Sequence, residues 1–333
     1  MAVLVTGGAG FIGSHMAWEL LDADEDVVVL DNLATGHAWA VPPEATFVHG
    51  DVGDPRLLVR LMQRHSVDAV IHMAGSTVVP ESVELPLRYY DNNTSKLRTL
   101  VETAIANSVR AFVFSSTAAV YGDVPPEPVG EDHALDPQSP YGRSKMMSEM
   151  ILQDAAAAHD LDVAILRYFN VAGGDPLGRT GQSTPNATHL IKVACEVATG
   201  KRPSMAVFGS DYDTPDGTAV RDFIHVSDLV AAHRKALAHL RAGRGGFLAN
   251  CGYGRGFSVR EVIDTVQTLS GRKIRTRKEP RRPGDLASVV ANSDRLRTLL
   301  DWTPRFDDLE TILAHALAWE RDLEMRPAAR LAS

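Results

Sequence analysis

Residues 7–13 read Gly7-Gly8-Ala9-Gly10-Phe11-Ile12-Gly13, a Gly-x-x-Gly-x-x-Gly spacing between an apolar segment and a helical pattern. Such glycines permit a tight turn and let a ligand approach the backbone, and the free N–H groups at the helix start favour a pyrophosphate. The next apolar segment ends in Asp31. A carboxylate there can accept from both ribose hydroxyls and would repel a 2′-phosphate. The stretch therefore predicts a site for NAD in preference to NADP, with an ordinary turn as the alternative.

Short apolar segments alternate with helical patterns in the first half, which predicts an α/β fold with a Rossmann-type doubly wound parallel sheet. The expected strands are Ala2–Thr6, Val27–Asp31, Ala69–His72, Ala111–Ser116 and Val163–Arg167. The expected later helices are Pro86–Asn107, Pro140–His159, Ser227–Leu240, Val259–Leu269 and Leu309–Leu323. We predict an NAD-binding domain over residues 1–168 and a smaller mixed α/β substrate-binding domain over residues 169–333, with segments such as residues 219–242 packing back on the first.

The composition is that of a globular protein, with 44% hydrophobic and 23% charged residues among 333. A net charge of −8 argues against nucleic-acid or acidic-membrane partners. Cys195 and Cys251 stand far apart, and neither they nor the 12 histidines show a metal-binding spacing, so we predict no metal and no disulfide framework. No signal peptide and no apolar run near the ~18 residues of a membrane span is visible, so we predict a cytoplasmic protein.

Tyr141 and Lys145 are four residues apart, and Ser139-Pro140 before them has the character of an N-cap and a first helical residue. The spacing places a phenol and an ammonium on one helix face. A nearby ammonium is expected to lower the phenol pKa and so to create a base for a hydroxyl proton. Thr117 follows an expected strand, at the edge where such sheets bind ligands. Taken singly, each residue also fits ordinary packing, solvation or a loop.

Three further segments fit a cofactor. Asp51 stands where an acid could bind the adenine amino group, or could make a turn. The small residues of Met73-Ala74-Gly75 would let a ligand lie against the backbone. Asn92 and Asn93 interrupt an expected helix, where asparagine is a poor helix former. They are expected to point at something polar, with local backbone bonding as the alternative.

Through these motifs the chain resembles the UDP-glucose 4-epimerases of the extended short-chain dehydrogenase/reductase superfamily. The resemblance runs nearly end to end. Besides residues 5–15 it is carried by Leu30-Asp31-Asn32-Leu33, Tyr89-Tyr90-Asp91-Asn92-Asn93, Pro137-Gln138-Ser139-Pro140-Tyr141-Gly142, Leu166-Arg167-Tyr168-Phe169-Asn170 and residues 216–226. The first motif belongs to the wider superfamily, and the last is more specific to sugar-nucleotide epimerases.

The resemblance implies a reaction and a set of site residues. Tyr141 would take the proton from the sugar O4 while C4 gives hydride to a tightly bound NAD that is regenerated in each turnover, Thr117 would hydrogen-bond the same oxygen, and Lys145 would bind the nicotinamide ribose. The implied cofactor-binding residues are Gly7, Gly10, Phe11, Ile12, Gly13, Asp31, Asn32, Asp51, Val52, Met73, Ala74, Gly75, Asn92, Ser115, Tyr141, Lys145 and Tyr168. The implied substrate-binding residues are Thr117, Asn170, His189, Leu190, Ala206, Val207, Phe208, Arg221, Arg282, Asp285 and Val289.

Several residues depart from the family pattern. Thr117 stands where the closest epimerases usually carry serine, and Ala118-Ala119 lacks the acid pair of the related dehydratases. Ser95-Lys96 replaces a usual small pair. Val289 is small where members restricted to plain hexoses often carry an aromatic residue.

The expected function is NAD-dependent 4-epimerisation of UDP-glucose and UDP-galactose, extended by the small Val289 to UDP-GlcNAc and UDP-GalNAc. The alternatives are 4-epimerisation of UDP-glucuronate or a UDP-pentose, a net NAD-dependent sugar-nucleotide reductase, and a non-catalytic NAD sensor. The resemblance also implies a homodimer that pairs the helices beginning near Pro86 and Pro140.

Overall fold

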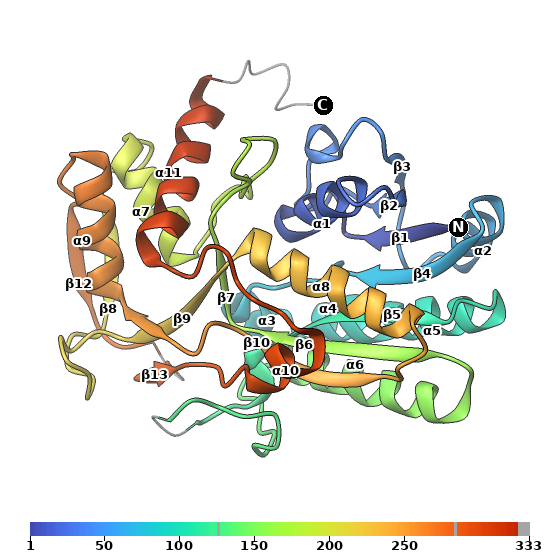
Figure 1. The fold of residues 1–333 in the computed structure, drawn as a ribbon. Coiled ribbons are helices and arrows are strands. Elements are labelled where there is room, and N and C mark those ends of the chain that lie inside the picture. Colours follow the sequence, from blue (N-terminus) through green and yellow to red (C-terminus); the bar gives the residue numbers. More distant parts are fainter. Residues whose placement is uncertain (125–126, 283–284, 326–333) are drawn as a thin grey trace.

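The computed structural model describes residues 1–124, 127–282 and 285–325. A seven-stranded sheet runs through it in the order β10-β6-β5-β4-β1-β2-β3, and every neighbouring pair is parallel (Figure 1). Its strands are β1 (Ala2–Thr6), β2 (Asp26–Asp31), β3 (Thr46–His49), β4 (Val67–His72), β5 (Ala111–Thr117), β6 (Asp162–Tyr168) and β10 (Phe247–Cys251). The predicted α/β class and doubly wound parallel sheet are confirmed.

Both faces of this sheet are apolar, because side chains alternate along a strand and helices cover both sides. On β1, Val3 and Val5 belong to one buried cluster and Ala2 and Leu4 to another. The first cluster includes α1 (Phe11–Leu21) and α8 (Val226–Arg241), which pack together. The second includes α2 (Pro55–Arg64), α5 (Lys96–Ala106) and α6 (Pro140–Ala158). Because the strands are parallel and helices cover both faces, the carboxyl ends of the strands lie along one edge of the sheet, where a site can form.

The helix predicted over Pro86–Asn107 is not continuous. It consists of α4 (Pro86–Tyr90), the π-helical turn η2 (Asp91–Ser95) and α5. Asn93 is buried within η2, and its Oδ1 accepts from the Ser76 amide over 2.8 Å while its Nδ2 donates to Ser144 Oγ over 3.0 Å. These partners are distant in sequence. Bonds to them explain why asparagine stands inside a helical segment better than bonds to the local backbone do. Short π-helical turns are frequent at functional sites.

The remaining elements form smaller layers beside the main sheet. A four-stranded sheet contains β7 (Asn170–Ala172), β9 (Val220–His225), β11 (Gly256–Ser258) and β13 (Ser288–Val289), and a two-stranded one contains β8 (Met205–Phe208) and β12 (Thr276–Glu279). The helices there are α7 (Leu190–Thr199), α9 (Val259–Ser270), α10 (Asp294–Leu300) and α11 (Leu309–Met325). Short elements in the first half are α3 (Val79–Glu84), η1 (Ala38–Ala40) and η3 (Ala118–Val120).

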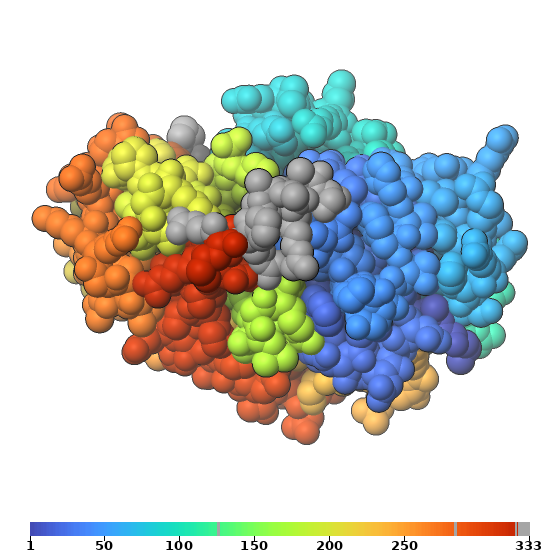
Figure 2. Space-filling model, turned by 90° about the horizontal axis from the view of Figure 1, so that it is seen from above, coloured from blue at the N-terminus to red at the C-terminus, as the bar shows by residue number. Residues whose placement is uncertain are grey.

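Two segments of the second half join the main sheet. Helix α8 packs on β5 and β6, and β10 forms the edge strand beside β6. Residues 175–184, which also belong to the second half of the chain, pack on α1. In Figure 2 this segment is yellow-green and lies between the blue N-terminal region and the red C-terminal helix. Thr180 Oγ1 is 2.8 Å from Ser14 Oγ of α1. The division at residue 168 into two domains stays a prediction.

None of the described helices is long and apolar enough to cross a membrane. The sequence did not predict β3 or β10, since both are short strands at the sheet edges.

Candidate active site

The glycine turn between β1 and α1 is shaped for close backbone approach. Gly7 has a φ of +70°, and a Cβ added to Gly13 would lie only 2.1 Å from the Gly7 carbonyl oxygen. The N-terminus of α1 has no side-chain cap, and while the Gly10 amide donates to the Gly7 carbonyl, the amides of the first helical turn that follow it can bind an anion. These features fit the pyrophosphate of a dinucleotide.

Asp31, at the end of β2, is held beside this turn. Its Oδ2 accepts from the Ala9 amide over 2.9 Å, and its Oδ1 accepts from the Leu33 amide over 2.7 Å. A carboxylate has about four acceptor positions, so two remain for the ribose hydroxyls that the sequence predicts. Asn32 lies next to it and accepts from the Ala34 amide over 3.1 Å.

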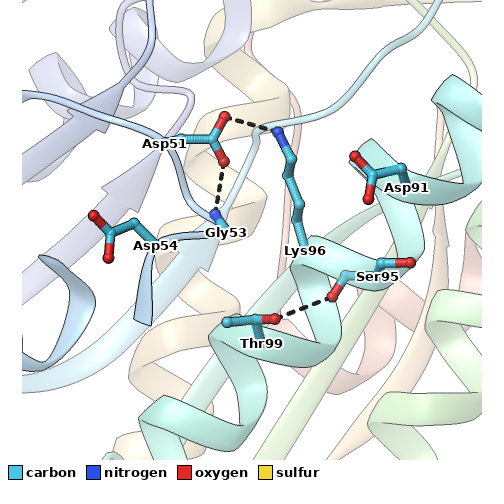
Figure 3. Close-up of a pocket in the computed structure, with 7 residues that line it drawn as sticks. All are labelled: Asp51, Gly53, Asp54, Asp91, Ser95, Lys96 and Thr99. Atoms are coloured by element: carbon cyan, nitrogen blue, oxygen red, sulfur yellow. Dashed lines mark hydrogen bonds and ion pairs between the residues drawn. The ribbon is translucent and has the colours of Figure 1, made fainter. Parts of the chain in front are cut away.

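Asp51 is engaged in an ion pair that the sequence did not predict. Lys96 Nζ lies 2.7 Å from Asp51 Oδ2, and the Gly53 amide donates to Asp51 Oδ1 over 2.8 Å (Figure 3). Burial raises the pKa of Asp51, but the bonds from Lys96 and Gly53 outweigh it and leave the pKa below its usual value. Asp51, Lys96 and Gly53 border a cavity of about 390 Å³, which is also lined by Asp54, Asp91, Ser95 and Thr99. The adenine role of Asp51 and its neighbour Val52 stays a prediction.

The small residues after β4 lie between the glycine turn and α6. A Cβ on Gly7 would come within 2.6 Å of the Ala74 amide nitrogen, and one on Gly75 within 3.6 Å of Lys145 Nζ. Met73 Sδ accepts from Ser115 Oγ over 2.7 Å. Asn92 Nδ2 donates to Ser76 Oγ over 3.0 Å. The segment thus joins the turn to the predicted reacting residues.

Tyr141 and Lys145 lie where the sequence places them, in the first turns of α6. Ser139 caps the helix by accepting from the Gly142 amide over 3.1 Å, and Pro140 is its first residue. Lys145 Nζ donates to the Ser115 carbonyl oxygen over 2.9 Å and lies 4.7 Å from the centre of the Phe114 ring. Both side chains are buried, at 6% exposure for Tyr141 and 4% for Lys145. A buried ammonium at the carboxyl end of a strand is typical of a functional site and not of a solvated surface.

Thr117, the last residue of β5, meets Tyr141. Burial raises the pKa of the Tyr141 phenol, and a hydrogen bond with Thr117 opposes the rise. The predicted lowering of that pKa is therefore wrong, because burial sets the direction of the shift and the opposing contribution comes from Thr117 and not from Lys145. Burial also lowers the pKa of Lys145 to about 8, although the charge of Glu149 acts in the opposite direction. Tyr168, at the end of β6, hydrogen-bonds Ser115 beside this group.

Sequence reasoning missed Glu149, which continues the four-residue spacing of Tyr141 and Lys145. It is 2% exposed, and its carboxylate pairs with Arg167 of β6. Extending the four-residue spacing by one more step along the sequence would have found Glu149, although not its burial or its partner Arg167. Lys96 was noted only as a departure, because its partner Asp51 is 45 residues away in sequence.

The predicted substrate-binding residues form two groups near the smaller sheets. Arg282 lies over the Phe208 ring at 3.8 Å from its centre, beside Ala206 and Val207 on β8. Arg221 on β9 is the register partner of Val289 on β13, and its Nη2 is 3.6 Å from Asp285 Oδ1. The two arginines thus contact different partners in this structure.

The remaining predicted substrate contacts are at element starts. Asn170 begins β7 directly after the strand that ends in Tyr168, and it is exposed. His189 and Leu190 begin α7, whose N-terminus has no side-chain cap and so offers free N–H groups. Burial lowers the pKa of His189, and its Nδ1 is 2.9 Å from Gln182 Nε2.

The chain matches the NAD dependent epimerase/dehydratase family over residues 3–252, and it belongs to that family. A UDP-glucose 4-epimerase of Azospirillum brasilense is 55% identical over 322 residues, which cover 97% of this chain and 92% of that protein. The crystal structure of UDP-glucose 4-epimerase from Brucella ovis in complex with NAD is 41% identical, with a TM-score of 0.93 over 95% of this chain and 97% of that one. The UDP-Glc/GlcNAc 4-epimerase of Campylobacter jejuni is 44% identical, with a TM-score of 0.84 over 96% of this chain and 99% of that one. The family predicted from the sequence is confirmed.

Proposed function

We propose that this protein is a UDP-hexose 4-epimerase that uses a tightly bound NAD and interconverts UDP-glucose and UDP-galactose. The observation that carries the proposal is the meeting of Tyr141 and Lys145, both buried, with Thr117 and Ser115 at the end of β5. Nothing in an NAD sensor requires a buried base of this kind. The glycine turn, Asp31 and the segment 73–75 would hold the cofactor beside it.

The side chains of this protein have distinct tasks in the reaction. Tyr141 removes the proton from the sugar O4 and later returns it, while Thr117 hydrogen-bonds the same oxygen. Burial raises the pKa of the phenol in the cofactor-free protein, and the positive charges of Lys145 and of bound NAD would lower it for this step. Lys145 holds the ribose near the reacting carbon and contributes positive charge. When bound, NAD supplies a hydride acceptor and a cationic ring. The residues of β8, β9 and β13 and the start of α7 hold the UDP group, so that the keto sugar can turn and present its other face.

Direct assay of C4 inversion tests this proposal. Purified protein is incubated with UDP-galactose, and the UDP-glucose formed is measured together with any free NADH. We expect inversion without net NADH, and its loss in Tyr141→Phe while NAD and UDP-sugar still bind. Stoichiometric NADH would instead identify a reductase, and an active Tyr141→Phe would refute the proton transfer.

The substrate range is proposed to include UDP-GlcNAc and UDP-GalNAc, because Val289 is small and lies on β13 beside Arg221 of β9. The UDP-Glc/GlcNAc 4-epimerase named above is consistent with such a range within the family. A panel with UDP-glucuronate and UDP-pentoses separates this proposal from the alternative sugar nucleotides.

We also propose a homodimer formed through α3, α4 and α6. Exposed apolar side chains gather on these helices, including Val83 at 64%, Leu87 at 80% and Met150 at 55% exposure. Sedimentation of Leu87→Asp/Met150→Asp should show monomers, whereas Leu177→Asp, at an equally exposed leucine elsewhere, should not. A monomeric native protein would refute the proposal.

The site of action is proposed to be the cytoplasm, since Cys195 and Cys251 are free and buried thiols that suit a reducing compartment. Cell fractionation tests this. The net charge of −8 continues to predict no nucleic-acid or acidic-membrane partner.

A further inference from the structure

Helix α6 carries a third polar residue on the face of Tyr141 and Lys145. Glu149 follows Lys145 by four residues, so the three side chains lie one above another along the helix. Three consecutive residues at the end of β5 meet them. The pairs are Thr117 with Tyr141, the Ser115 carbonyl with Lys145, and the Ser116 hydroxyl with Glu149. Each of the three helix side chains therefore has a partner at the strand end, and Glu149 belongs to the same set of contacts as the reacting pair.

The carboxylate of Glu149 is fixed from both of its oxygens. Arg167 Nε donates to Oε1 over 3.0 Å, and Arg167 Nη2 donates to Oε2 over 2.6 Å. Arg167 is itself fixed, because its Nη1 donates to the Tyr121 hydroxyl over 3.1 Å and its guanidinium lies 4.9 Å from the centre of that ring. Glu149 and Arg167 are 2% and 3% exposed. A bidentate buried pair of this kind holds its members in one geometry.

The charge of Glu149 acts on Lys145. The titratable groups around the ammonium are Tyr141 and Glu149 on its own helix and His72 on β4, with Tyr168 of β6 beyond Tyr141. Burial lowers the pKa of His72 to about 3, so His72 is uncharged near neutral pH. Of the surrounding groups, Glu149 is the carboxylate, and its charge favours the protonated form of Lys145. Arg167, which is bound to that carboxylate, carries a positive charge that acts in the opposite direction.

We propose that Glu149 is a positioning residue of the reaction, which aligns α6 with the end of β5 through Ser116 and balances the ammonium charge of Lys145. Glu149 need not touch the substrate for this role. The proposal rests on the epimerase function proposed above. A purely structural Glu149–Arg167 pair would stabilise the fold and leave the titration of Lys145 unchanged.

The test uses the NAD-loaded protein and two variants at this site. Glu149→Gln keeps the size and hydrogen-bonding groups of the side chain and removes its charge. Glu149→Met/Arg167→Met removes both charges, so that neither is left buried without its partner. Lys192→Met/Glu320→Met is the control away from β5, since Lys192 and Glu320 form another buried ion pair, between α7 and α11. Glu320 also binds Lys201 there, and Lys192 also lies near Glu196.

Two quantities are measured in each protein. One is the pH profile of kcat for epimerisation, and the other is the NMR titration of ¹³Cε-labelled lysine, with the Lys145 signal assigned by its loss in Lys145→Met. We expect Glu149→Gln to move the titration of Lys145 and the alkaline limb of kcat to lower pH by about one unit. The double variant should move both in the same direction by less, because it also removes the positive charge of Arg167. The control should move neither.

Folded variants with reduced stability but an unmoved Lys145 titration would overturn the proposal and leave the pair purely structural. If the wild-type protein showed no epimerisation, the proposed function would be wrong, yet the NMR titration would still decide whether Glu149 governs the charge of Lys145. The two failures are therefore distinguishable.

Discussion

The guanidinium of Arg282 lies over the ring of Phe208, 3.8 Å from its centre, and so joins the loop after β12 to the end of β8. Both residues are predicted to contact the UDP group. Because a guanidinium stacks on a ring and binds phosphate through two parallel hydrogen bonds, lysine is a poor substitute for it.

Replacement of Arg282 is expected to weaken substrate binding. Arg282→Lys and Arg282→Ala should raise the KM for UDP-galactose by about 10-fold or more, in line with about 1.5–3 kcal/mol for a charged hydrogen bond, with a smaller effect on kcat. Initial-rate kinetics measure both constants. Arg281→Ala is the control, since Arg281 is paired with Asp211 and stacks on Tyr212. Equal effects of the two substitutions would contradict a specific role for Arg282.

Enlargement of Val289 is expected to narrow the substrate range. Val289→Tyr places a ring beside Arg221, its register partner on β9. Turnover of UDP-GlcNAc should then fall far more than turnover of UDP-glucose, because the acetamido group needs the space that the ring takes. Paired assays of the two sugars give the ratio. An unchanged ratio would show that Val289 lies away from the sugar.

Asp31 is expected to control the choice of dinucleotide. Asp31→Asn removes the negative charge but keeps an acceptor for the Leu33 amide, which Asp31 binds over 2.7 Å. The affinity for NADP relative to NAD should rise, since a carboxylate repels a 2′-phosphate. Calorimetric titration of cofactor-stripped protein measures both affinities. A preference identical to that of the wild type would place the ribose elsewhere.

Lys145 is expected to destabilise the cofactor-free protein while it serves the reaction. Its pKa is lowered from 10.5 to about 8, chiefly by burial. The unfolded chain therefore binds more protons between these values, so stability rises with pH across that window and the full penalty is present below pH 8. Lys145→Met should raise the unfolding free energy at pH 7 by up to about 3 kcal/mol.

That stabilisation should largely disappear once the pH reaches the unfolded pKa of lysine, 10.5. Urea unfolding of cofactor-stripped wild type and Lys145→Met at pH 7 and at pH 10.5 measures the difference. A gain that is equal at both pH values would come from packing of the methionine and not from the charge.

The main sheet was predictable because its inner strands are continuous apolar segments. Such segments are typical of parallel strands that are covered by helices on both faces of a sheet. The edge strands β3 and β10 escaped prediction, since an edge strand is set by its neighbour more than by its own residues. Tyr141 and Lys145 were predictable because their relation is local, four residues along one helix. The Asp51–Lys96 and Glu149–Arg167 pairs join residues 45 and 18 positions apart, which no local spacing reveals.

The phenol pKa shows a second limit of sequence reasoning. The spacing of Tyr141 and Lys145 indicates attraction between a phenolate and an ammonium, but it does not indicate how deeply the phenol is buried. Burial dominates in the structure, so the direction of the shift is opposite to the prediction. The packing of α6 on β5 decides how deeply the phenol is buried, and that packing depends on the whole fold.

The pairing of β10 with β6 has a consequence for how the chain matures on the ribosome. The edge strand ends at Cys251, and α8, which covers β5 and β6, is made only shortly before it. A nascent chain that stops at Tyr168 therefore exposes an apolar sheet face that lacks its covering helix. During synthesis more than eighty further residues must follow Tyr168 before α8 and β10 can complete the sheet, and in that interval the uncovered apolar face is exposed to aggregation.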